Sequence, residues 1–100
     1  MDITLRIKGK DKTFVADFIN ARCFRNLLKL NQEIDYDNLT DADLDKMVDL
    51  MVQVYGKQFT RDELYDGLRS NSLINEWLKV AGGIMNEFSD SVGEDNNEKN

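Results

Sequence analysis

One stretch of the sequence, V-Q-V-Y-G-K-Q-F-T-R-D-E-L-Y-D-G-L (residues 52–68), sets the geometry of the chain, because it ends one amphipathic helix and begins another. Gly56 follows the first apolar pattern, at a position where a left-handed residue ends many helices. Thr60 and Glu63 have the spacing of a capping box, in which each side chain accepts from the backbone N–H of the other residue. Phe59 is placed to pack on Leu64 as a hydrophobic staple. We therefore expect a fixed corner between two helices.

Helical spacing of apolar residues predicts further helices on both sides of this corner. Asp17 or Asn20 is suited to cap a helix at roughly residues 20–33. Thr40 then begins a helix with acidic first turns, whose inward stripe is Leu44, Met47, Val48, Met51, Val54 and Tyr55. A short helix follows near residues 61–68, with Leu64, Tyr65 and Leu68 inward.

The first residues predict a β-hairpin instead, because Ile3, Leu5 and Ile7 alternate with polar residues. We expect the turn at residues 9–12 and a short second strand at residues 13–15. Basic residues recur at every second position, as expected for the solvated face of a hairpin; these are Arg6, Lys8, Lys10 and Lys12.

The last helix, from about Ser72, carries more apolar residues than one packing face requires. One stripe holds Ile74, Trp77, Leu78, Ala81, Met85 and Phe88, and Leu73, Val80 and Ile84 widen it. Gly82 and Gly83 predict a bend or a close approach there. Interfaces favour aromatic anchors, so the candidate partner-binding residues are Trp77, Val80, Ile84 and Phe88. The alternative is that these residues belong to the core. For Trp77 taken alone a core position is the favoured interpretation, whereas for Val80, Ile84 and Phe88 both interpretations stay open.

These patterns predict a mostly α fold, with a short N-terminal β-hairpin followed by about four helices in a small bundle. We expect one globular domain at residues 1–88, made of a hairpin (1–16) and a helical part (20–88). The segment 89–100 holds one large apolar residue, Val92, and should form a flexible acidic tail.

Composition excludes several functions. The chain has no His, which removes histidine catalysis. Its single cysteine, Cys23, excludes a disulfide within the chain and a thiolate metal cluster made by one chain, and it should be a buried small hydrophobe. The net charge is −6, and residues 31–100 alone carry six Lys/Arg against sixteen Asp/Glu, so nucleic acid and membranes are unfavourable partners. The acidic series Asp41, Asp43, Asp45 fails as a calcium loop, because Lys46 replaces the required glycine. We expect no enzyme, no metal and no cofactor.

Three segments resemble the tail assembly chaperones of long-tailed phages and prophages of Gram-positive bacteria. They are F-I-N-A-R-C-F-R-N-L-L-K-L-N (residues 18–31), D-L-D-K-M-V-D-L-M-V-Q-V-Y-G-K-Q-F-T (43–60) and D-E-L-Y-D-G-L (62–68). The resemblance covers roughly residues 1–88 and contains no catalytic motif.

The resemblance implies an assembly factor that binds the tape measure protein, keeps it soluble and helps recruit tail tube subunits. It implies work in the host bacterial cytoplasm, absence from the mature virion, and weak or client-dependent self-association. A structural tail or connector subunit and a small acidic regulatory domain remain as alternatives. The family also implies a longer, frame-shifted form, and suitable codons for Glu98, Lys99 and Asn100 contain a slippery A-AAA-AAY run; the gene sequence tests this.

Overall fold

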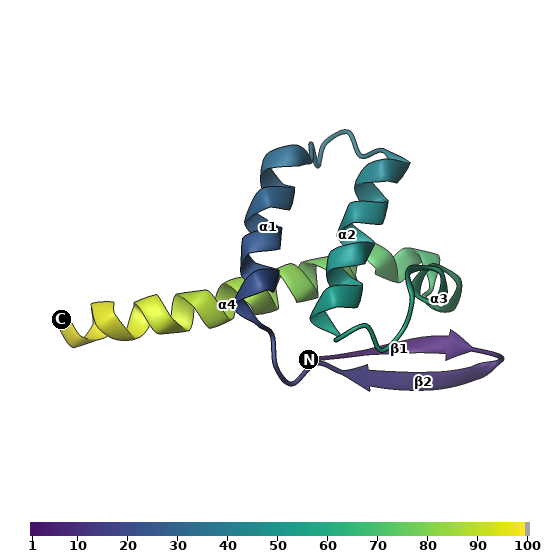
Figure 1. Cartoon of the computed structure of the whole chain (residues 1–100), viewed down its shortest axis with the longest axis horizontal. Coiled ribbons are helices and arrows are strands. Elements are labelled where there is room, and N and C mark those ends of the chain that lie inside the picture. The colour runs from purple at the N-terminus through teal and green to yellow at the C-terminus, as the bar shows by residue number, and fades with distance from the viewer. Residues whose placement is uncertain (100) are drawn as a thin grey trace.

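The chain folds as a two-stranded hairpin followed by four α-helices, in a computed structural model that describes the backbone of residues 1–99 and the side chains of residues 1–88 (Figure 1). The strands are β1 (Asp2–Ile7) and β2 (Lys10–Val15), and the α-helices are α1 (Ala21–Glu33), α2 (Asp41–Val54), α3 (Arg61–Gly67) and α4 (Leu73–Lys99), with a 3-10 turn at Ser70–Ser72. The predicted fold class is confirmed.

The long helix α4 crosses behind the lower halves of α1 and α2 in Figure 1 and extends past α1. Its backbone is helical as far as Lys99. The flexible tail predicted from Ser89 onward falls on residues whose side chains lie outside those described, so it stays a prediction, as does the domain boundary at residue 88.

The hairpin turn is shorter than predicted and begins one residue earlier, at residues 8–9 instead of 9–12. Lys8 and Gly9 both have left-handed φ values, 54° and 79°, which make a tight two-residue turn of the kind that matches strand twist. Lys10 therefore pairs with Ile7, and Lys12 pairs with Leu5. Directly paired residues share a sheet face, so Lys10 and Lys12 lie on the Leu5 face while Arg6 lies on the other. The prediction of one basic face is wrong.

Side-chain caps fix the start of each of the first three helices. Asn20 accepts from the backbone of Cys23 at 3.1 Å, and Thr40 and Asp43 form a capping box. The predicted box of Thr60 and Glu63 is present, with bonds of 3.1 and 2.9 Å. The corner before it contains Gly56 in the expected left-handed conformation, at φ 70°.

One core joins the hairpin to all four helices. The β1 residues Ile3 and Leu5 are buried in it, and Phe59 from the corner packs against Phe14 and Tyr55 at ring-centroid distances of 4.9 and 5.6 Å. Cys23 is buried, as predicted, and burial raises the pKa of its thiol. The corner therefore connects the sheet to the helices through Phe59; the staple contact with Leu64 stays a prediction.

Two glycines mark close approaches between segments. A Cβ on Gly67 would lie 2.8 Å from the carbonyl oxygen of Arg6, so α3 rests directly on β1. A Cβ on Gly83 would meet the side chain of Met1, whereas the space beside Gly82 is open. The sequence predicted a close approach at Gly82 and Gly83. In the structure the close neighbour is Met1, and it approaches Gly83 but not Gly82.

Candidate partner-binding surface

Helix α4 presents two adjacent apolar faces. Trp77, Val80 and Ile84 recur at helical spacing and are buried in the core. The second face, which we call the α4 seam, consists of Ile74, Leu78, Ala81, Met85 and Phe88. Leu78 is 60% exposed, Ile74 47% and Phe88 45%, although residues of this kind usually pack inside. The surplus apolar arc of the last helix is therefore open to solvent on the seam side.

An apolar groove of about 540 Å³ lies between the first half of the α4 seam and the α1–α2 loop. Its walls are Asn31, Tyr36, Leu39, Met47, Ile74, Trp77, Leu78 and Ala81. Tyr36 is held over the groove because its hydroxyl donates to Asn31 Oδ1 at 2.6 Å. Partial burial raises the pKa of the Tyr36 hydroxyl. The groove suits an apolar occupant.

The other end of the α4 seam meets the beginning of α1. Phe88 stacks on Phe24, with ring centroids 4.6 Å apart and an interplanar angle of 14°. Leu28, one turn after Phe24, is 44% exposed. Apolar surface therefore extends from the groove along α4 to α1.

The structure separates the four candidate residues of the sequence. Phe88 is accessible, whereas Trp77, Val80 and Ile84 are buried, and only Trp77 among these three lines the groove. Their partner-binding role stays a prediction. Sequence reasoning placed Ile74, Leu78 and Met85 on the apolar stripe but did not select them. The sequence feature that could have identified them is the regular spacing of four, three, four and three residues from Ile74 to Phe88, which is typical of a helix face that packs on another helix.

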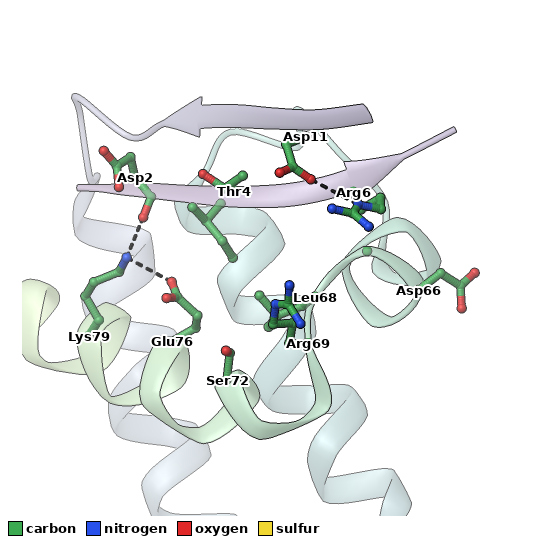
Figure 2. A pocket seen from close by; sticks show the side chains of 12 residues that line it. Asp2, Thr4, Arg6, Asp11, Asp66, Leu68, Arg69, Ser72, Glu76 and Lys79 are labelled. Carbon is green, nitrogen blue, oxygen red and sulfur yellow. Dashed lines mark hydrogen bonds and ion pairs between the residues drawn. The ribbon is translucent and has the colours of Figure 1, made fainter. Parts of the chain in front are cut away.

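A second cavity, of about 520 Å³, lies between β1, the end of α3 and the start of α4 (Figure 2). Four of the seven charged side chains that line it form ion pairs with one another. Arg6 contacts Asp11 at 3.1 Å and Lys79 contacts Glu76 at 2.9 Å, while Asp66 points away from the cavity. Arg69 and Asp2, which carry opposite charges, form no ion pair among the described residues. Because most of the lining is polar or charged, this cavity is a weaker candidate for packing an apolar partner.

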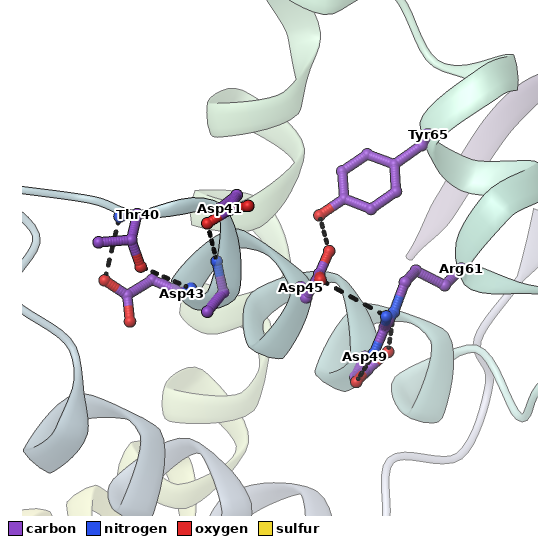
Figure 3. A network of polar contacts seen from close by, with 8 residues as sticks. Thr40, Asp41, Asp43, Asp45, Asp49, Arg61 and Tyr65 are labelled. Atoms are coloured by element: carbon purple, nitrogen blue, oxygen red, sulfur yellow. Dashed lines mark hydrogen bonds and ion pairs between the residues drawn. The ribbon is translucent and has the colours of Figure 1, made fainter.

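The acidic series at the start of α2 has structural partners (Figure 3). Asp43 caps its own helix, Asp49 accepts two bonds from Arg61 at 2.8 and 2.6 Å, and Asp45 accepts from the hydroxyl of Tyr65 at 2.8 Å. Pairing with Asp49 raises the pKa of Arg61 further. Among the residues whose side chains are described, no group of three or more acidic or cysteine side chains is placed to hold a metal ion.

The described residues also contain no helix that is both long enough and apolar enough to cross a membrane. A family model described as "Phage tail chaperone protein" matches residues 1–100. No curated protein matches the chain. No solved structure matches it either.

Proposed function

Because the chain belongs to the phage tail chaperone family, we propose that it binds the tape measure protein in the α4 groove, keeps that protein soluble and helps recruit tail tube subunits. The Ile74–Leu78 end of the α4 seam, with Tyr36 opposite, is the observation that carries this proposal. An amphipathic helix of such a client would lay its apolar face into a groove that is itself apolar.

The same proposal assigns the protein a non-enzymatic role. The α4 groove offers shape and apolar area, and none of the eight residues that line it is charged. Binding by packing needs no acid, base or nucleophile. We infer that the chaperone acts in the host cytoplasm, is absent from the mature virion, and self-associates weakly or only on its client.

A co-expression experiment tests the proposal. A tape measure fragment that is insoluble alone should become soluble with the wild-type chaperone, and should stay insoluble with Leu78→Glu. Leu78 is exposed, so the variant should fold. The matched control is Asn86→Glu, which adds the same charge at an exposed position of α4 off the seam. Equal rescue by Leu78→Glu and wild type would refute binding in the groove.

Purified virions separate this function from its main alternative. A chaperone should be missing from virions, whereas a structural tail or connector subunit would be present in stoichiometric amounts. A regulatory domain, in turn, would leave tape measure solubility unchanged in the co-expression experiment.

A further inference from the structure

The loop that closes the α4 groove is acidic. Tyr36, which lines the groove, is flanked in the sequence by Asp35 and Asp37, and both carboxylates are exposed. Oδ1 of Asp35 accepts from the backbone N–H of Asp37 at 3.0 Å, which holds the loop in shape. Two exposed carboxylates therefore flank a groove residue in the sequence, and the backbone of the loop holds the carboxylate of Asp35 in place.

Helix α2 adds a third carboxylate on the same side. Asp43 lies one turn before Met47, and residues four apart share a helix face. Met47 lines the groove, so Asp43 lies on the same face of α2, where its carboxylate accepts from the backbone N–H of Thr40. The nearby cation on α2, Lys46, is paired with Glu33 at 3.2 Å. The groove is thus apolar inside and negatively charged around its loop end.

This charge pattern distinguishes between two kinds of occupant. A second copy of the chain would bring a net charge of −6 to the interface. Like charges brought together at an interface oppose binding. A helix that carries cations beside its apolar stripe gains attraction instead, and Lys and Arg also cover apolar surface with their aliphatic stems.

Resting on the function proposed above, we propose that the client segment that enters the α4 groove is an amphipathic helix with Lys or Arg beside its apolar stripe. The apolar side chains pack on Ile74, Leu78 and Ala81. The cations of the client face Asp35, Asp37 and Asp43 at the mouth.

Trp77 provides a direct readout, because it is the single tryptophan of the chain and lines the groove. Two synthetic helices of about 18 residues, roughly five turns, share one leucine stripe and differ only in having Lys or Glu beside it. Titrated into the full-length protein at low salt, the Lys helix should change Trp77 fluorescence at a concentration at least about tenfold lower than the Glu helix. High salt should reduce this preference.

Paired variants test the acidic mouth. Asp35→Asn with Asp37→Asn should weaken binding of the Lys helix several-fold and strengthen binding of the Glu helix, because two like charges no longer oppose it. The control is Asp62→Asn with Asp66→Asn on α3, which changes net charge equally at exposed residues away from the groove. Equal affinity for the two helices, or equal effects of both double variants, would overturn the inference while leaving the proposed function intact.

Two other outcomes are distinct from these. If Leu78→Asn, which removes the apolar contact and adds no charge, binds the Lys helix as well as wild type does, the groove is not the binding site, and the groove assignment in the proposed function fails with the inference. If the protein alone forms a dimer that Leu78→Glu dissociates, a second copy occupies the groove and the inference about a basic client is overturned.

Discussion

The hydroxyl of Tyr65 on α3 donates a hydrogen bond of 2.8 Å to Oδ1 of Asp45 on α2. This bond crosses the corner that joins the two helices, beside the pairing of Arg61 with Asp49 (Figure 3). Tyr65→Phe removes the bond and leaves the ring. We expect the free energy of unfolding to fall by about 1 kcal/mol in urea denaturation.

Tyr55→Phe is the matched comparison. The Tyr55 hydroxyl is buried and has no hydrogen-bond partner among the described residues. Removing an unpaired buried hydroxyl should leave the free energy of unfolding unchanged or raise it by up to about 1 kcal/mol. A loss in Tyr55→Phe equal to that in Tyr65→Phe would contradict the assignment of partners.

Stability should decrease at alkaline pH. Burial, reinforced by the bond to Asp45, raises the pKa of Tyr65 from 10.0 to about 12, and burial also raises the pKa of Tyr55. The unfolded chain loses these protons near pH 10, while the folded chain keeps them longer, so the stabilisation present below pH 10 is lost as pH rises toward 12. Thermal melts should show a shallower alkaline decline for Tyr65→Phe; an unchanged slope would contradict the shift.

The capping box of Thr60 and Glu63 should contribute about as much to the free energy of unfolding as other N-caps do. Thr60→Ala removes the acceptor for the backbone N–H of Glu63 and should lower the free energy of unfolding by about 1 kcal/mol. Thr60→Ser keeps a hydroxyl at the same place and should remain close to wild type. Equal loss in both variants would mean that the methyl group of Thr60, and not its hydroxyl, stabilises α3.

Alanine at two glycines should have opposite effects. In Gly67→Ala the new Cβ would lie 2.8 Å from the Arg6 carbonyl oxygen, and overpacking of this kind costs about 1–3 kcal/mol. Gly82→Ala places a methyl group in open space within α4, where alanine is better than glycine by about 1 kcal/mol. Melting temperatures should fall for the first variant and rise for the second. A fall in both would show that α4 needs Gly82 for another reason.

Local signals in the sequence predicted most of the fold. The left-handed Gly56 and the Thr60–Glu63 box are confirmed because their chemistry is contained within a few residues. The predicted position of the hairpin turn was wrong because the real turn places Lys8 at φ 54°. Lysine rarely adopts this conformation, so the sequence does not indicate it. The structure was also needed to explain why glycine occupies position 67, because Arg6, which leaves no room for a side chain there, is distant in sequence.

The sequence could not predict which apolar residues of α4 are buried and which are exposed. Trp77, Val80 and Ile84 face the core, whereas Ile74, Leu78 and Met85 face solvent, yet all six are apolar and share one broad arc. Hydrophobicity alone does not divide such an arc. The division depends on where α1, α2 and the hairpin stop covering the helix, which is a property of the packed domain.

The spacing of the α4 seam has a geometric consequence for whatever packs along it. Steps of four, three, four and three residues average 3.5, while an α-helix has 3.6 residues per turn. The seam therefore drifts around α4 by about 20° for every seven residues, or roughly 40° between Ile74 and Phe88. A straight rod laid parallel to α4 would leave the seam before its end. A partner helix that keeps contact must cross at about 20° with a left-handed twist, so the seam favours clients whose own apolar residues repeat every seven positions.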